Sequence, residues 1–233
     1  MNFLNEIRRR NYLLYVYGWI MVLGMVVCII MTQVSYTQVL GINAWIKPMK
    51  FYLSIWIFCW TMAWLLHELD NKRAVRRYSI MVLIVMTIEM LVINGQAAIG
   101  QKSHFNNSTP LNGALFSIMG IAITTLGVWT GVIAWRFFKQ KQFNAPMAYI
   151  WGIRLGIILF VFFSFEGGLM ASRLSHTVGS VDGSTGLPLV NWSRQYGDLR
   201  IAHFIGIHAL QVLPLLGYYL LRTKQQVWIA ATV

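Results

Sequence analysis

Two histidines on one polar face of an apolar segment are the residues in this chain best suited to chemistry. His203 and His208 lie in segment 199–221, which also carries Arg200 and Gln211. At about 100° per residue, these four side chains fall within roughly 140° of arc on a helix. A membrane helix turns such a stripe toward protein or water, and not toward lipid. The stripe therefore predicts a site for a metal, a haem or a proton.

Two acidic residues inside other apolar segments point to the same kind of site. Glu89 lies in segment 78–98, and Glu166 lies in segment 147–171. A charge near the membrane centre costs roughly 2.5–3.5 kcal/mol on insertion scales, so each needs a reason to be there. Together with the two stripe histidines, these carboxylates predict one shared, outward-facing pocket. Within it we expect Glu89 and Glu166 to be the catalytic residues.

Two cofactor chemistries fit these residues, and both would support redox chemistry. For haem b, an axial histidine of the stripe would pair with His104 or His176 in the loops. For zinc, copper or iron, Glu166 would join His176 and one stripe histidine. The two stripe histidines are five residues apart, about 140° around the helix, so we do not expect both to bind one iron. The predicted cofactor-binding residues are His104, His203 and His208, and the predicted metal ligands are His176, His203, His208 and Glu166.

Two functions of other classes also fit the same residues. Chains of intramembrane Glu and His carry protons in transporters, which predicts a proton-coupled carrier of small molecules. Buried polar groups also fix helix packing, which predicts a non-catalytic membrane partner protein. An apolar substrate, either a lipid or a quinone-like molecule, would reach such a site from the bilayer.

The elements that position these residues are membrane helices. The chain has 233 residues, of which 57% are hydrophobic and 11% charged. Runs of about 20 apolar residues are long enough to cross the hydrocarbon core. The sequence therefore predicts an all-α, polytopic membrane protein in a single domain, 1–233. Its six predicted spans are 12–34, 49–67, 78–98, 111–137, 147–171 and 199–221.

The positions of the charges behind the net charge of +12 predict how the chain is oriented in the membrane. Twelve Lys and Arg lie on the side of both termini and six on the other, so we expect both termini in the cytoplasm of a bacterium, with the protein in its inner membrane. The apolar end of the tail, 227–233, is expected at the membrane interface. No basic stripe is interleaved with exposed aromatic residues, so we expect no nucleic-acid partner.

Segments 94–104 and 166–176 share identical residues at a constant offset. If they are repeats, spans three and four form a parallel repeat of spans five and six. The aligned pairs are Gly95 with Gly167, Ser103 with Ser175 and His104 with His176.

Four features outside the pocket also carry expectations. Lys47 and Lys50 oppose the charge bias, and we expect interfacial anchoring or contact with an anionic group. Arg154 should snorkel or pair with a carbonyl. Asp198 should cap the following helix. The long loop 172–198 should fold over the outer mouth as a lid.

Overall fold

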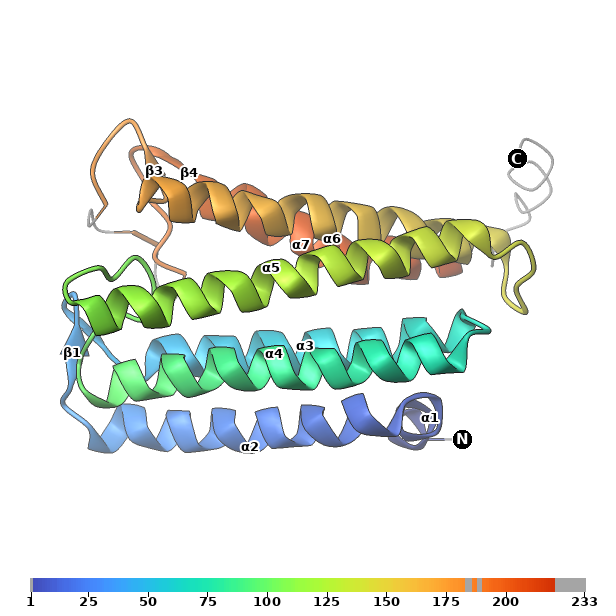
Figure 1. Cartoon of the computed structure of the whole chain (residues 1–233), viewed down its shortest axis with the longest axis horizontal. Helices are drawn as coiled ribbons and strands as arrows, with labels where there is room; N and C mark the ends of the chain where they lie inside the picture. Colours follow the sequence, from blue (N-terminus) through green and yellow to red (C-terminus); the bar gives the residue numbers. More distant parts are fainter. Residues whose placement is uncertain (1, 183–185, 188–189, 221–233) are drawn as a thin grey trace. The chain divides into compact units, whose positions relative to one another are not determined.

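The chain folds almost entirely into helices. The structure is a computed structural model that describes residues 2–182, 186–187 and 190–220 (Figure 1). In this part of the chain, six helices are long and apolar enough to cross a membrane, which confirms the all-α, polytopic architecture. They are α2 (Tyr12–Val34), α3 (Ile46–Leu65), α4 (Lys72–Ala98), α5 (Pro110–Lys139), α6 (Met147–Arg173) and α7 (Leu199–Leu220).

The helices belong to two compact units. The first unit is Met1–Leu126 and the second is Gly127–Val233, so α5 contributes to both. In the first unit, α3 packs along α2 and also contacts α4 (Figure 1). In the second unit, α6 and α7 lie side by side (Figure 1). The tail segment 227–233 lies outside the described residues.

A short helix precedes the first span. Helix α1 (Phe3–Arg10) holds Glu6, whose carboxylate accepts hydrogen bonds from Arg9 and Arg10. The Arg10 guanidinium also donates to the Glu68 carboxylate beyond the end of α3, at 3.1 Å. These contacts tie α1 to the first unit. A search for apolar runs overlooks such a helix because most of its side chains are polar.

Helix α4 begins six residues before the predicted span. The Asn71 side chain accepts a hydrogen bond from the Ala74 amide and caps the helix at Lys72. The basic residues predicted to lie in a loop therefore form the first turns of α4. Hydropathy marks where a helix enters lipid, whereas a capping side chain marks where the helix begins.

The polar segment 35–48 contains a small hairpin. Strand β1 (Gln38–Val39) pairs antiparallel with β2 (Ile42–Asn43). The Asn43 side-chain amide donates to the Ser35 carbonyl oxygen at 2.8 Å, which closes the hairpin against the end of α2. Helix α3 starts directly after it, with Pro48 in its first turn, where the missing proline N–H removes no helical hydrogen bond.

Glycines allow α6 and α7 to approach closely. A Cβ atom at Gly152 would collide with the Leu213 carbonyl oxygen. At Gly156, a Cβ atom would lie 3.0 Å from the Ala209 carbonyl oxygen. Small residues at a membrane helix interface let two backbones meet, and packing then holds the helices together. The α6–α7 pair is therefore the closely packed core of the second unit.

Arg154 links α6 to the end of α5. It is only 7% exposed, and its guanidinium donates to the Phe137 and Gln140 carbonyl oxygens at 3.1 and 3.3 Å. Carbonyls at the end of a helix lack partners within the helix, so a cation there satisfies them and complements the helix dipole. The predicted pairing of Arg154 with a carbonyl is confirmed.

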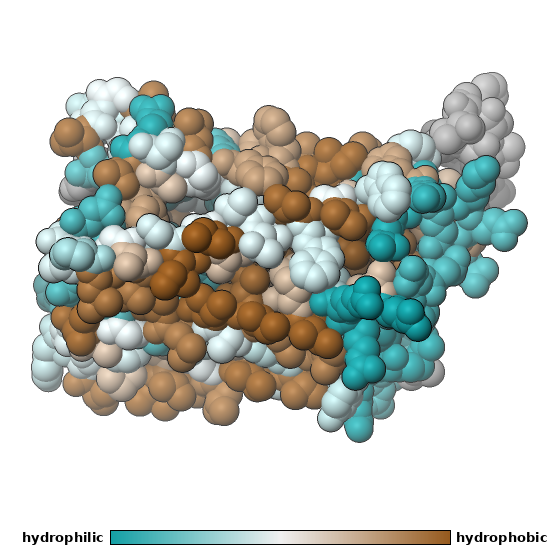
Figure 2. All heavy atoms as spheres, in the orientation of Figure 1, coloured by the Kyte–Doolittle hydropathy of each residue, from teal (hydrophilic) through white to brown (hydrophobic). Residues whose placement is uncertain are grey.

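The exposed surface of the helices is apolar. In α2, Ile20, Leu23, Ile30 and Val34 are each more than half exposed. In Figure 2, hydrophobic residues cover the middle of the visible helices and hydrophilic residues gather toward their ends. A surface of this kind matches a lipid bilayer, whose core is about 30 Å thick.

The close approach of α6 and α7 gives a first prediction. Gly152→Ala should lower the free energy of unfolding by about 1–3 kcal/mol, because the new methyl group forces two backbones apart. The measurement is thermal unfolding in detergent. Gly168→Ala, in the same helix, is the control, because a Cβ there meets nothing within 4 Å. Equal midpoints for the two variants would contradict the close packing.

Candidate functional site

The residues predicted to share one pocket belong to different units. Glu89 and His104 lie in the first unit. The second unit contains Glu166, His176, His203 and His208. Each group is built by its own helices, and the shared pocket stays a prediction.

In the first unit, Lys47 and His104 form a direct contact. Lys47 lies in the first turn of α3, and His104 lies in the loop that follows α4. The Lys47 Nζ is 3.2 Å from the His104 Nδ1, and the Ser103 Oγ is 3.1 Å from the same nitrogen. The loop thus returns onto the start of α3. Lys47, which the sequence marked only by its unusual charge, is part of this site.

The chemical form of His104 follows from its surroundings. An ammonium group can only donate, so Nδ1 accepts from Lys47 and the ring hydrogen lies on Nε2. Burial, and secondly the charge of Lys47, lower the pKa of His104 to about 3. The imidazole ring therefore stays neutral at physiological pH. The rings of Phe51 and Phe116 lie 5.5 and 6.3 Å from it, centroid to centroid.

Glu89 lies deeper in the same unit. It is 5% exposed, and its Oε1 atom is buried without a hydrogen-bond partner among the residues that the structure describes. Lys47 is within electrostatic reach of this carboxylate. A buried carboxylate needs a cation, a proton or hydrogen-bond donors to offset its lost hydration. The group that offsets the lost hydration of Glu89 can therefore be either a cation or a proton.

A polar network holds the loop beside this site. The Gln96 amide donates to the Asn112 Oδ1 atom at 2.9 Å, which joins α4 to α5. Asn112 in turn donates to Gln101 and Ser108 in the loop, at 2.7 and 2.9 Å. These bonds fix the segment that carries His104. Sequence reasoning missed this network, because the partner of Gln96 lies in another helix.

In the second unit, His203 joins α7 to α6. Its Nδ1 is 2.6 Å from the Phe163 carbonyl oxygen. Since a carbonyl oxygen only accepts, Nδ1 carries the hydrogen, and in the neutral ring the lone pair lies on Nε2. The ring also lies against Gly167, where a Cβ atom would be 3.5 Å from the His203 Cε1. The interface therefore holds His203 in one orientation.

Glu166 accompanies His203. Its Oε2 atom is buried without a hydrogen-bond partner, and its charge acts on His203. Glu166 is adjacent to Gly167, so the α6 backbone that supports the His203 ring also carries this carboxylate. The second unit therefore places an acid and a base together, as the first unit does with Glu89 and Lys47.

His208 lies on a different part of α7. Its Nδ1 is 3.1 Å from the side-chain oxygen of Gln211, and its ring is 4.3 Å from that of Phe204, centroid to centroid. His203, by contrast, bonds to α6. The two histidines of the stripe therefore have separate partners.

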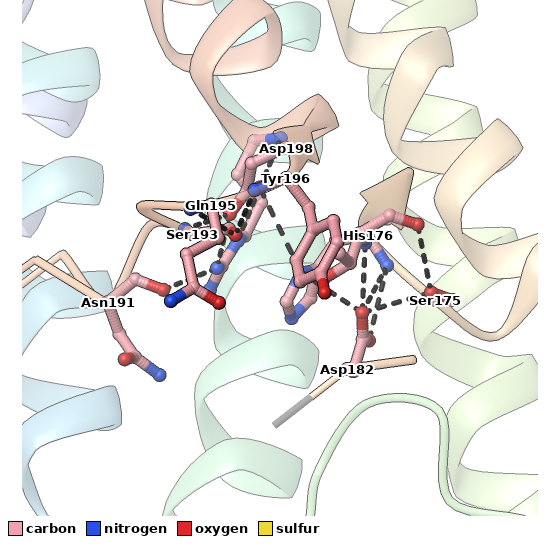
Figure 3. A network of polar contacts seen from close by, with 10 residues as sticks. Ser175, His176, Asp182, Asn191, Ser193, Gln195, Tyr196 and Asp198 are labelled. Carbon is pink, nitrogen blue, oxygen red and sulfur yellow. Dashed lines mark hydrogen bonds and ion pairs between the residues drawn. The ribbon is translucent and has the colours of Figure 1, made fainter. Parts of the chain in front are cut away.

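His176 belongs to a polar network at the start of α7 (Figure 3). Strand β3 (Thr177–Val178) pairs with β4 (Gly197–Asp198), and the His176 Nδ1 lies 3.3 Å from the Asp182 carboxylate. Burial, and secondly the charge of Arg200, lower the pKa of His176. His176 thus contributes to the contacts of this loop, and its predicted role as a metal ligand stays a prediction.

Asp198 is the centre of this network. Its carboxylate accepts from the Ser193 amide at 2.9 Å and from the Arg200 guanidinium at 2.6 Å (Figure 3). It also accepts from the Arg200 amide, which confirms that Asp198 caps α7. Burial raises the pKa of Asp198, but the bonds from Arg200 and Ser193 outweigh burial and lower it to about 2.

The arrangement of these residues suits proton exchange, or one bond from a histidine to a ligand, better than a metal site built from three or more side chains. Among the residues that the structure describes, no three His, Cys, Asp or Glu side chains gather closely enough to hold a metal ion. The loop 172–198, expected to act as a lid, includes 183–185 and 188–189, which lie outside the described residues. The lid and the internal repeat stay predictions.

Asp198 gives a second prediction. Because its pKa falls from 3.8 to about 2 on folding, its charge stabilises the protein above pH 4, and this contribution is lost as pH falls toward 2. Asp198→Asn should therefore reduce the free energy of unfolding at pH 7 by about 2 kcal/mol. Thermal unfolding in detergent at pH 7, 4 and 2 measures this.

The exposed Arg194 provides the control for Asp198, since Arg194→Gln should leave the midpoint unchanged at each pH. A deficit in Asp198→Asn that stays constant from pH 7 to pH 2 would contradict the role of the carboxylate charge.

Comparison with known proteins adds no relative. The chain matches no protein-family model, no curated protein and no solved structure.

Proposed function

We propose that the protein moves protons, together with a small solute, across the membrane that its helices span. Two buried carboxylate oxygens without hydrogen-bond partners carry this proposal, Glu89 Oε1 and Glu166 Oε2. Each lies in a helix long enough to span the membrane. Each also has a base within electrostatic reach, Lys47 for Glu89 and His203 for Glu166.

A carboxyl group in this setting can be satisfied in more than one way. Without a proton it needs a neighbouring cation, and with a proton it is neutral and much less costly in an apolar environment. A nearby ammonium group such as Lys47 stabilises the ionised carboxylate, and a neutral His can take up the proton that the carboxyl group releases. Pairs of this kind are the elements from which proton paths in membrane transporters are built.

A role in packing alone fits these carboxylates less well. A polar group that joins helices can have a fixed partner, as the Asn11 amide has in the Ser79 hydroxyl at 2.8 Å. Glu89 and Glu166 each keep a buried carboxyl oxygen without a hydrogen-bond partner among the described residues. Unlike an amide, a carboxyl group can resolve this by gaining a proton, which favours a group that gains and loses a proton during function.

The test is proton movement in liposomes that contain the purified protein. Under an imposed membrane potential, wild-type liposomes should change internal pH faster than protein-free liposomes, as read from a trapped pH-sensitive dye. Glu89→Gln should reduce the rate by tenfold or more, because the amide cannot release a proton. Glu166→Gln should have the same effect.

A matched control is Glu6→Gln, because Glu6 lies in α1 outside the spans and is paired with arginines. Its rate should equal that of wild type. Infrared spectra after a pH jump add an independent reading, since loss of a carboxyl band in Glu89→Gln identifies the group. Unchanged flux in both Glu89→Gln and Glu166→Gln would end the proton proposal.

Haem or metal binding is a second candidate, favoured by the geometry of His203. Histidines that bind metals usually donate their second ring N–H to a carbonyl or carboxylate, which orients the ring. The bond from Nδ1 to the Phe163 carbonyl is of this kind, and it leaves the Nε2 lone pair available. A haem iron needs only one or two such axial ligands.

Absorption spectra and elemental analysis of the purified protein test this candidate. A bound haem gives a Soret band, and another metal gives one equivalent of iron, copper or zinc per chain. His203→Ala should abolish either signal, whereas His67→Ala, which alters a histidine beyond the end of α3, should retain it. The absence of both signals from the wild-type protein would remove the cofactor candidate.

A further inference from the structure

Three lysines gather where α3 begins and α4 ends. Lys47 and Lys50 lie in the first turns of α3, and Lys102 lies in the loop after α4. Lys50 and Lys102 both act electrostatically on Lys47. We call these three residues the lysine cluster. Like charges repel, so an anion bound beside these lysines would be stabilised by their charge.

The adjoining segments of the first unit supply no negative charge. Segments 35–50 and 99–110 contain no Asp or Glu. Among the described residues, the acidic group that acts on Lys47 is Glu89, inside the membrane span of α4. Within the described part of the first unit, Lys47 thus has more positive than negative charge around it.

The neighbouring groups suit the recognition of a phosphate. Lys47 has three N–H donors, of which one is directed at the His104 Nδ1. His104 is neutral, and its hydrogen lies on Nε2, which makes no hydrogen bond among the described residues. Ammonium and imidazole N–H groups are strong donors to phosphate oxygens. The Phe51 and Phe116 rings beside His104 provide an apolar wall for the rest of such a molecule.

Simple anchoring at the membrane interface explains the lysine cluster less well. A lysine that only anchors extends toward water and needs no partner. Lys47 instead turns to His104, which burial and the Lys47 charge keep neutral, and a polar network fixes the loop that carries this histidine. The contact holds the ammonium group in a defined position, as a binding site requires.

We propose that the lysine cluster and His104 bind the phosphate group of an anionic ligand at this end of the first unit. Lys47 and the His104 Nε2–H are the oriented donors, and Lys50 and Lys102 add charge. The ligand is either the headgroup of an anionic lipid or a soluble phosphate. This site shares Lys47 with the proposed proton pair, but binding is measured without proton movement, so each proposal can fail while the other holds.

The experiment uses the full chain in lipid nanodiscs. In one arm, inorganic phosphate is titrated calorimetrically into protein in phosphatidylcholine discs. In the other, discs contain a fraction of phosphatidylglycerol without free phosphate, and native mass spectrometry counts the lipids that stay bound. Lys47→Gln and Lys102→Gln are the test variants. Lys141→Gln, in the segment between α5 and α6, is the charge-matched control.

We expect wild-type protein to bind in at least one arm, and Lys47→Gln to weaken that binding about tenfold or more through the loss of a charge-assisted hydrogen bond. Lys102→Gln changes an exposed side chain and should weaken binding less without affecting folding. Binding of phosphate identifies a soluble ligand, and retention of phosphatidylglycerol alone identifies a lipid. Absence of binding in both arms, or an equal loss in the control, overturns the proposal. If Lys47→Gln fails to fold, the binding measured for Lys102→Gln is compared with that of the same control.

Discussion

Every polar group inside these helices must find a partner, because hydrocarbon offers none. This constraint explains most of the polar contacts in the described structure. Asn11 is bonded to Ser79, Gln96 is bonded to Asn112, and Arg154 is held by carbonyl oxygens at the end of α5. These bonds join helices or helix ends. Among the described residues, some buried side-chain atoms still lack a hydrogen-bond partner, and two of them, Glu89 Oε1 and Glu166 Oε2, belong to carboxyl groups, which can gain and lose a proton.

The two units place a basic residue near a carboxyl group in different ways. In the first unit, the basic residue is a lysine ammonium at a helix start, and a loop histidine accepts one of its hydrogens. In the second unit, the basic residue is itself a histidine, oriented by a backbone carbonyl of the neighbouring helix. The side chains on which the proposed function rests thus come from a helix interior, a helix terminus and a loop.

The sequence predicted the six spans well because apolar length is a direct consequence of bilayer thickness. It placed the start of α4 six residues late, since Asn71 begins this helix by a local hydrogen bond that hydropathy does not register. It identified Glu89 and His203 as costly residues from their type alone. It could not identify the contact of Lys47 with His104, because 57 residues separate them and only the folded loop brings them together.

The glycine contacts between α6 and α7 have a consequence for motion. Two helices whose backbones touch at Gly152 and Gly156 cannot slide or separate without losing that fit. In any rearrangement of the second unit, α6 and α7 therefore move together as one rigid body. Glu166 on α6 and His203 on α7 therefore move together and keep a constant spacing. In the proposed proton carrier, only the environment of this pair would change, as alternating access requires.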